Sequence, residues 1–265
     1  MTKNQFLDVK TKLPKFHFTS LLFTEYEELV DYEILLNKQN VIILYGFNAE
    51  DRNYEFHWAC NNVQELLEGL VKKNNNEKIT FVPKEWIKDL MTAGFEIQAV
   101  WNDYFSTDLE TYANYVEPVF VNESNYIEAS EVTRSCAGGS RGFAGQSKEW
   151  MKQWINNLEP AVPDYASSCT VLAECRNEMI GVVCIGIYGE KDKTTLWIRE
   201  IAVKPEFRRQ GIARKLLGQA FAYGQRHGVK RAFLLVDECN DIALQLYKSM
   251  GFAADSEEGQ IDMIR

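Results

Sequence analysis

A basic turn at residues 204–215 is the first feature of the chain with chemical potential. It places five cationic side chains within twelve residues, although the chain as a whole has a net charge of −9. These side chains are Lys204, Arg208, Arg209, Arg214 and Lys215. Gly211 has no Cβ, so a ligand can approach the backbone of this turn closely. A helix that begins here would add unpaired N–H groups and the positive end of its dipole, which indicates a phosphate-binding site.

The residues on either side predict the elements that position this turn. Apolar and β-branched residues before Lys204 and Pro205 predict a buried strand that ends at Val203. After Gly211, apolar residues recur at helical spacing, at Ile212, Leu216, Leu217, Ala220 and Phe221. The strand is therefore expected to position the start of a helix at this turn.

A second strand and helix are predicted at residues 231–252. Apolar residues at 231–236 favour a short strand, and the spacing of apolar residues from 242 to 250 favours a helix. Gly251 stands where a glycine usually ends a helix, and Phe252 begins an extended segment. Asn240, directly before this helix, is a good N-cap residue.

These segments resemble the signatures of the GNAT superfamily, the acyl-CoA-dependent N-acyltransferases. The motifs that carry the resemblance are Arg208-x-x-Gly211-x-Ala213 and Asn240-x-x-Ala243-x-x-x-Tyr247-x-x-x-Gly251. The first is similar to the family's Q/R-x-x-G-x-G/A loop, but a basic turn ahead of an ordinary amphipathic helix would look the same. Both motifs in the right order, separated by a helix of the right length, favour the family for residues 121–265.

The resemblance implies acetyl-CoA as the cofactor and suggests which residues hold it. In this family the strand pairs with the pantetheine arm and the amides of the loop hold the pyrophosphate. The strand residues would be Ile201, Ala202 and Val203. The loop residues would be Arg208, Arg209, Gln210, Gly211, Ile212, Ala213 and Arg214. Asn240 would hydrogen-bond the pantetheine, cap the helix at Asp241, or do both.

Tyr247 is the candidate general acid, because the family motif places a proton donor there. A phenol with a reference pKa near 10 stays protonated at neutral pH, yet it can give its proton to a departing thiolate. The alternative is a tyrosine that only packs against the face of a helix.

Glu200 is the candidate general base. An amine with a lysine-like pKa is almost wholly protonated at pH 7, so a group must accept its proton directly or through water. Glu200 lies in the strand that would border the acyl site, and period-two alternation predicts that it faces away from Arg199 and Ile201. The alternative is a glutamate paired with a neighbour on the sheet.

Composition excludes several other classes of function. The chain has 265 residues, 46% of them hydrophobic and 25% charged, which is ordinary for globular domains and sufficient for two of them. The six cysteines form no Cys-x-x-Cys pair, and three histidines are too few and too scattered for a metal site, so no metal is expected. No apolar run approaches the ~20 residues of a membrane span, and the first residues lack an apolar signal core. A cytoplasmic protein without a membrane partner is expected.

Charge is divided unevenly along the chain. Residues 1–120 hold 19 acidic and 11 basic side chains, a net charge of −8, whereas residues 121–265 have a net charge of −1. Such a chain is a poor candidate for nucleic-acid binding, which depends on neutralising phosphates. A small cationic amine is the favoured partner, and a homodimer is left open.

The first half of the chain repeats part of the pattern of the second. Strands are expected at 41–45, 54–58 and 78–82, and helices at 63–71 and 86–91; the second helix is closed by Gly94 and Phe95. Superposing Gly94-Phe95 on Gly251-Phe252 places Leu90 where Tyr247 stands. Residues 1–120 therefore resemble a degenerate copy of the same fold without the cofactor loop, although an unrelated α/β domain remains the alternative.

The fold class that follows is α/β (α+β), a GNAT-like mixed twisted sheet flanked by helices. Residues 121–265 are expected to form this domain, after a smaller α/β domain at residues 1–120, so that the chain is a tandem GNAT arrangement. The order includes helices at 127–132 and 150–158 around a Gly-rich loop at 136–145, which would border the acceptor pocket. A β-hairpin at 169–188 and a last strand at 260–264 complete it.

The predicted function is transfer of an acetyl group from acetyl-CoA to a primary amine of a small molecule or amino acid by direct attack. Two alternatives remain: a noncatalytic acyl-CoA-binding or sensing module, and a protein N-acetyltransferase. A proton donor at Tyr247 favours an enzyme, because a binding module has no use for one.

Overall fold

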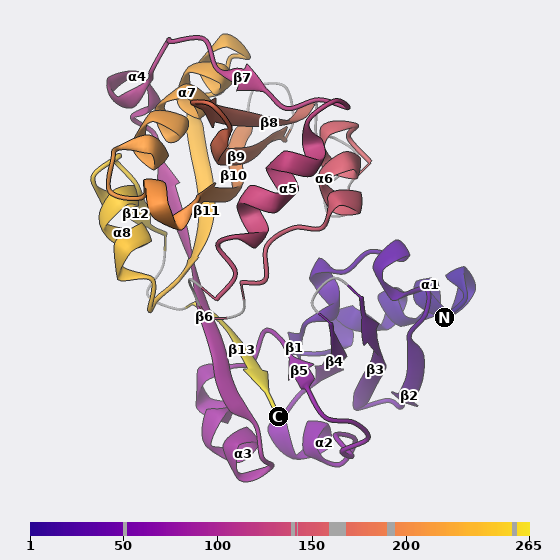
Figure 1. Cartoon of the computed structure of the whole chain (residues 1–265). Helices are drawn as coiled ribbons and strands as arrows, with labels where there is room; N and C mark the ends of the chain where they lie inside the picture. Colours follow the sequence, from indigo (N-terminus) through magenta and orange to yellow (C-terminus); the bar gives the residue numbers. More distant parts are fainter. Residues whose placement is uncertain (50–51, 139–140, 142, 159–167, 190–193, 256–258) are drawn as a thin grey trace. The chain divides into compact units, whose positions relative to one another are not determined.

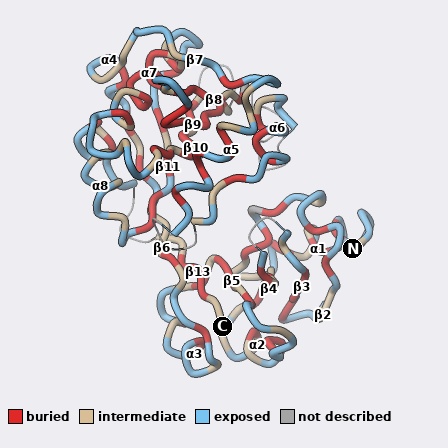
Figure 2. The backbone as a smooth tube through the Cα atoms, in the orientation of Figure 1, coloured by how far each residue is buried: buried red, intermediate tan, exposed pale blue. Residues whose placement is uncertain are grey.

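The chain folds into two compact units. The computed structural model describes residues 1–49, 52–138, 141, 143–158, 168–189, 194–255 and 259–265 (Figure 1). The first unit comprises Met1–Trp101 and Gly259–Arg265, and the second comprises Asn102–Glu258. Figure 2 shows that buried residues follow the strands of each unit.

The first unit is a mixed sheet with helices on both faces. Its strands are β1 (Phe18–Thr19), β2 (Glu33–Asn37), β3 (Val41–Asn48), β4 (Asn53–Cys60), β5 (Glu77–Ile79), the first part of β6 (Glu96–Ser106) and β13 (Gln260–Ile264). Its helices are α1 (Lys3–Lys12), α2 (Val63–Leu67) and α3 (Ile87–Thr92). Strands β2, β3 and β4 are antiparallel, β5 runs parallel to β4, and β13 lies between β5 and β6, antiparallel to both.

Alternation along β3 explains the two layers of the first unit. Val41, Ile43 and Tyr45 belong to the hydrophobic cluster that includes residues of α2 and α3. Ile42 and Leu44 point the other way and join the cluster that includes residues of α1. Because successive side chains of a strand face opposite sides, an uninterrupted apolar run is buried on both faces of the sheet.

The second unit is also a mixed sheet between two layers of helices. Its helices are α4 (Leu109–Tyr112), α5 (Tyr126–Arg134), α6 (Lys148–Ile155), α7 (Ile212–Arg226) and α8 (Asp241–Lys248). Its strands are β7 (Val119–Phe120), β8 (Ser168–Cys175), β9 (Met179–Tyr188), β10 (Thr195–Val203), β11 (Arg231–Asp237), β12 (Ala253–Ala254) and the second part of β6. Strands β7 to β10 are antiparallel in succession, and β11 runs parallel to β10.

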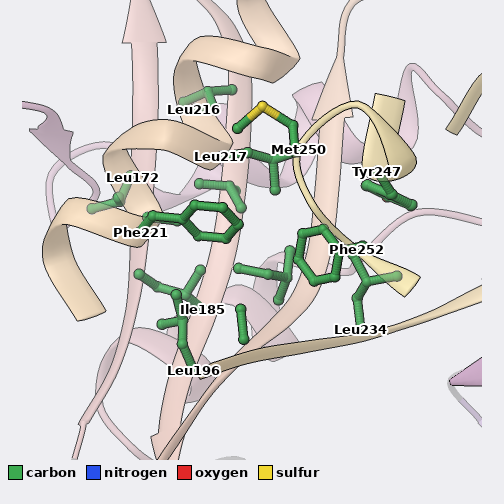
Figure 3. Close-up of a cluster of buried hydrophobic side chains, with 14 of the residues drawn as sticks. Leu172, Ile185, Leu196, Leu216, Leu217, Phe221, Leu234, Tyr247, Met250 and Phe252 are labelled. Atoms are coloured by element: carbon green, nitrogen blue, oxygen red, sulfur yellow. The ribbon is translucent and has the colours of Figure 1, made fainter. Parts of the chain in front are cut away.

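The two faces of the second sheet have separate cores. One core packs β9, β10 and β11 against α7 and α8 around residues such as Leu217, Phe221 and Phe252 (Figure 3). The other packs the opposite face against α5 and α6, where Trp150 stacks on Trp154 with ring centres 5.0 Å apart. Both layers of helices are therefore fixed to the sheet by apolar burial.

The internal repeat predicted from Gly94 and Gly251 is present in the backbone. Both glycines have a positive φ, +92° and +80°, and each ends a helix that follows a strand parallel to its neighbour. The amide of Phe95 donates to the carbonyl of Leu90, and the amide of Phe252 donates to that of Tyr247, at 3.0 and 3.1 Å. Leu90 and Tyr247 thus occupy the same place in equivalent helix ends.

The helix that follows the central strand begins differently in the two units. In the first unit α2 has five residues, and the side chain of Asn62 caps it by accepting a hydrogen bond from the amide of Glu65. In the second unit α7 has 15 residues and begins at Gly211, without a side-chain cap. The start of α2 therefore lacks the features of an anion-binding turn.

The structure divides the chain between residues 101 and 102, not at the expected boundary between residues 120 and 121. Residues 102–120 belong to the second unit because Leu109 is buried in the α7 core and the amide of Asn114 donates to the carbonyl of Gly218 at 2.8 Å. No residue pattern near 101 marks this division, because β6 continues through it.

The assignment of residues 260–264 to the C-terminal domain was wrong. These residues form the predicted strand, but β13 pairs with β5 and with the first part of β6, so it belongs to the first unit. Ile261 and Met263 are buried in the core that α2 and α3 cover. An apolar alternation predicts a strand but carries no information about its partner.

Glu77 ties the end of the chain to the first unit. Its side chain is fully buried and accepts hydrogen bonds from the Tyr45 hydroxyl at 2.8 Å and from the amides of Lys73 and Asn74 at 2.9 Å. The guanidinium of Arg265 lies 2.9 Å from the same carboxylate. Burial alone would raise the pKa of Glu77, but these hydrogen bonds hold the pKa below its usual value.

We expect Glu77→Gln to lower the free energy of unfolding by about 3 kcal/mol, because it leaves Arg265 buried without its carboxylate. Urea denaturation at neutral pH measures this loss. Because the pKa of Glu77 is lowered on folding, the carboxylate stabilises the protein above pH 4.5, and the difference between the proteins shrinks as the pH falls. The exposed Glu96→Gln is the control, with an expected change below about 0.5 kcal/mol. Equal losses in the two variants would contradict a structural role for the pair.

Candidate active site

The parallel strands β10 and β11 separate partway along their length. They pair at Thr195, Leu196 and Trp197, yet β10 continues to Val203 and β11 to Asp237. On its other edge β10 stays paired with β9 as far as Val203. Within the described residues, one edge of β10 from Ile198 to Val203 therefore has no partner strand.

The backbone groups of Ile201 and Val203 point toward this open edge. The amide of Lys204 donates to the carbonyl of Ile180 at 2.9 Å, so Lys204 and Ala202 face β9 and the residues between them face away. The Val203 carbonyl accepts hydrogen bonds from Arg208 Nε at 3.1 Å and from Cys136 Sγ at 3.2 Å. Of the three strand residues predicted to hold pantetheine, two thus present their polar groups to the open edge, and Ala202 presents its own to β9.

The open edge leads directly to the start of α7. A short 3-10 turn at Pro205–Phe207 is followed by Arg209 and Gly211, whose φ angles of +62° and +78° curl the backbone into the helix. A Cβ added at Gly211 would meet no atom within 4 Å, so glycine is needed here for its backbone angle and leaves space above the turn. Arg209, Gln210 and Gly211 are exposed. Ile212 is buried in the core and anchors the helix.

Two of the five cations at this turn are neutralised within the protein. Lys204 pairs with Glu178, and Lys215 with Glu174 at 2.6 Å. The remaining three, Arg208, Arg209 and Arg214, have no carboxylate partner in the described ranges. Arg214 instead donates to the Ser249 hydroxyl at 2.6 Å. Three guanidinium groups beside a helix N-terminus suit a pyrophosphate.

Tyr247 lies in the core on α8, with its ring against Phe252 at a centre-to-centre distance of 5.9 Å (Figure 3). Its side chain is only 7% exposed, and no described residue hydrogen-bonds to its hydroxyl. Burial, and next the negative charge of Glu200, raise the pKa of Tyr247 well above the usual 10. The phenol is therefore protonated throughout the physiological pH range, as a proton donor must be.

A β-bulge determines where Glu200 points. Between Ile198 and Glu200 the register with β9 shifts by one residue, so that Ile198 and Ile201 both join the α7 core although they are three residues apart. Glu200 is turned to the α5 and α6 face, where its Oε2 accepts a hydrogen bond from Gln146 Nε2 at 2.8 Å. The expectation that Glu200 faces away from Ile201 is met. The same expectation for Arg199 was wrong, because Arg199 also lies on the α6 side, 5.7 Å from the ring centre of Trp150.

Gln146 is a site residue that the sequence did not reveal. Its amide donates to Thr133 Oγ1 at 2.9 Å, and its carbonyl accepts from Ser130 Oγ at 2.8 Å, so α5 holds its backbone on both sides. Gly145 before it has a φ of +78°, and a Cβ there would lie 2.5 Å from the Cα of Arg134. The Gly-rich loop was expected to border the acceptor pocket. Residues 139, 140 and 142 of it lie outside the described residues, and its end is held against α5.

Arg141 and Asp237 form a second contact that sequence reasoning missed. Arg141 donates through Nε and a terminal nitrogen to both oxygens of Asp237, at 2.9 and 2.6 Å. Asp237 ends β11 and is 1% exposed. The hydrogen bonds with Asp237 raise the pKa of the Arg141 guanidinium. An Asp directly after an apolar strand was visible in the sequence, but its partner is 96 residues away.

Asn240 caps α8, as one of its two predicted roles requires. Its Oδ1 accepts a hydrogen bond from the amide of Ala243 at 3.2 Å. The contact with pantetheine stays a prediction.

In the described part of the chain, no group of three His, Cys, Asp or Glu side chains is arranged to hold a metal ion. No described helix is long and apolar enough to cross a bilayer.

Comparison with known proteins finds a family that part of the chain matches. Residues 141–252 match the Acetyltransferase (GNAT) family. N-acetyltransferase family 8 member 3 of Rattus norvegicus is 33% identical over 94 residues, which are 34% of this chain and 40% of that protein, so the chain spans two fifths of its length. An uncharacterised N-acetyltransferase of Chlorobaculum tepidum, CT2212, is 27% identical over 138 residues, 52% of this chain and 77% of that protein.

Solved structures extend the likeness of fold to the whole chain. A GNAT acetyltransferase from Colwellia psychrerythraea has a TM-score of 0.56 at 13% identity and covers 100% of this chain and 97% of its own. A tandem GNAT protein from the clavulanic acid biosynthesis pathway has a TM-score of 0.57 at 10% identity, covering 85% of this chain and 78% of its own. The match to the GNAT family thus covers residues 141–252, and the solved structures show a similar fold with a second domain before the matched part. The predicted fold class is confirmed, and the tandem protein supports the tandem arrangement.

We expect the pair of Arg141 and Asp237 to respond asymmetrically to substitution. Arg141→Gln removes both hydrogen bonds of the guanidinium to the deeply buried carboxylate and should lower the free energy of unfolding by about 3 kcal/mol. Asp237→Asn leaves Arg141, which reaches solvent, and should cost only about 1 kcal/mol. Denaturant unfolding of both variants measures this difference. Arg226→Gln, which breaks only the exposed pair with Glu117, is the control. Losses of equal size at positions 141 and 237 would contradict the asymmetry.

Proposed function

We propose that the chain is an acetyl-CoA-dependent N-acetyltransferase that acts on a primary amine of a small molecule or amino acid by direct attack. The observation that carries this proposal is the open edge of β10, which runs straight into the uncapped start of α7. An extended amide-containing arm fits an unpaired strand edge, and a pyrophosphate fits a helix N-terminus. Pantetheine and pyrophosphate are joined in this order in coenzyme A.

The residues present fit such a ligand. The polar groups of Ile201 and Val203 would bond the pantetheine arm. The amides from Arg209 to Arg214, with the three guanidinium groups that lack a carboxylate partner, would take the pyrophosphate. Bound acetyl-CoA would supply the acetyl group, as its C–S bond breaks while a new N–C bond forms. Asn240 would contact the arm from the start of α8.

Tyr247 and Glu200 would move the protons. Glu200 would accept the proton of the incoming amine, which is mostly charged at neutral pH. Tyr247 would give its proton to the departing sulfur. Burial, and next the negative charge of Glu200, raise the pKa of Tyr247, which keeps its proton available for the sulfur. A cytoplasmic location and a small amine partner belong to the same proposal.

We expect Tyr247→Phe to lower kcat by about 10²-fold while acetyl-CoA binding changes by less than about twofold, because only the proton donor is lost. Thiol release and calorimetric titration measure the two quantities. The raised pKa keeps the phenol protonated, so the ratio of wild-type to variant kcat should stay constant from about pH 6 to about pH 9. Tyr115→Phe, at an exposed tyrosine, is the control. Binding without turnover of any amine by the wild type would favour the sensing module instead.

We expect Gly211→Asn to weaken acetyl-CoA binding by at least about tenfold, because its side chain would occupy the space above the turn. Asparagine tolerates a positive φ, so the stability loss should be only about 1 kcal/mol. Gly228→Asn is a matched control: Gly228 has the same φ of +78°, also without an atom within 4 Å of an added Cβ, but follows the other end of α7. Equal effects of both variants on binding would place the cofactor elsewhere.

A further inference from the structure

Two pairs of side chains on the α6 side of β10 make up what we call the acceptor cluster. Its members are Gln146, Trp150, Arg199 and Glu200. Gln146 Nε2 donates to Glu200 Oε2 at 2.8 Å, and the guanidinium of Arg199 lies 5.7 Å from the ring centre of Trp150. Arg199 and Glu200 are neighbours at the bulge, and Gln146 and Trp150 stand at the start of α6. Two contacts thus join the same two segments.

Arg199 is a cation held in place without an anion. Its guanidinium packs against two indole rings, those of Trp150 and Trp197, the second at 5.6 Å. Its side chain is partly buried, and no described carboxylate pairs with it. Arginine is seldom buried unless it is paired, and its planar fork matches a carboxylate through two parallel hydrogen bonds.

Two further polar atoms of the cluster lack partners. Gln146 Oε1 and Trp150 Nε1 are both buried and make no hydrogen bond with any described residue. Their side chains are only 7% and 4% exposed. A buried donor or acceptor left unpaired typically costs about 1–3 kcal/mol. A ligand that offers an acceptor to Trp150 and a donor to Gln146 would satisfy both.

We propose that the acceptor cluster binds an amine that also carries a carboxylate, which is the α-amino-acid class. Its carboxylate would lie at Arg199 and Trp150 Nε1, and its amine at Glu200 and Gln146 Oε1. A positive and a negative side chain side by side complement a zwitterion. This inference rests on the proposed acetyl transfer, in which the amine nitrogen bonds to the acetyl carbon as the C–S bond breaks. The charged amine gives one proton to Glu200, and the proton of Tyr247 passes to the sulfur. The second amine proton, lost as the amide forms, returns to the Tyr247 oxygen.

The cluster disfavours the other classes of acceptor. A simple alkylamine has nothing to place at Arg199. A protein N-terminus has a neutral amide where an amino acid has its carboxylate, so it would leave the charge of Arg199 unmatched. Both are therefore expected to be poorer acceptors than a free amino acid.

Thiol-release kinetics over the common L-amino acids, each paired with its carboxamide, tests this inference. At least one amino acid should exceed its carboxamide in kcat/KM by at least about tenfold. In Arg199→Gln this preference should disappear through a higher KM with little change in kcat, and Arg199→Lys should restore part of it. Arg231→Gln, which removes an arginine stacked on Phe105 instead, is the matched control and should keep the preference. The proposal would be overturned if the wild type turned over the carboxamides equally well. It would also be overturned if the preference for the amino acid remained in Arg199→Gln.

Calorimetric titration of the preferred amino acid, in the presence of coenzyme A, separates this inference from the acetyl transfer. If the wild-type protein turns over no amine, the whole panel of amino acids is titrated in place of the preferred one. Binding that weakens at least about tenfold in Arg199→Gln, but not in Arg231→Gln, supports the carboxylate site even if no amine is turned over. Absence of turnover with every amine would overturn the acetyl transfer alone. Absence of amino-acid binding to the wild type would overturn the carboxylate site.

Discussion

The site depends on the separation of β10 from β11 after Trp197. Backbone N–H and C=O groups need partners, and a strand whose edge loses its neighbour in the middle of a sheet presents them to a ligand. The same strand remains paired with β9 to its end, so the open edge is rigid. Because β10 ends directly before the turn at Gly211, one strand aligns an edge for an extended arm with a helix start for an anion. The order of the two subsites therefore follows from chain connectivity.

The bulge at Arg199 adds the proposed catalytic and acceptor groups to this edge. Without it, strict alternation would place Arg199 and Glu200 on opposite faces of the sheet. The extra residue leaves both side chains on the α6 side, and returns Ile201 to the core beside Ile198. One irregularity in the ladder thus brings a cation and a carboxylate together without exposing the apolar core.

The sequence predicted those features whose causes are local. Gly211 and Gly251 mark positive-φ positions, the apolar periods mark β10, α7, β11 and α8, and the repeat was visible at Gly94. The features that it could not predict depend on contacts between distant residues. Gln146 meets Glu200 across 54 residues and Arg141 meets Asp237 across 96, and nothing near either residue identifies its partner. The bulge and the pairing of β13 were missed for the same reason, since register is set by packing.

The two units share an architecture but differ in a few residues at the start of one helix. These residues decide whether the helix start is capped by side chains. In the first unit the helix after β4 already has its own acceptors: Asn62 takes the amide of Glu65, and the carboxylate of Glu65 takes the amide of Asn61 at 3.1 Å. That carboxylate also supplies the negative charge that a helix N-terminus attracts. In the second unit Gly211 has no side chain to fill this role, and Arg208, Arg209 and Arg214 stand within three residues of it. The start of α2 is capped by side chains of the first unit, whereas the start of α7 is left open for the proposed ligand.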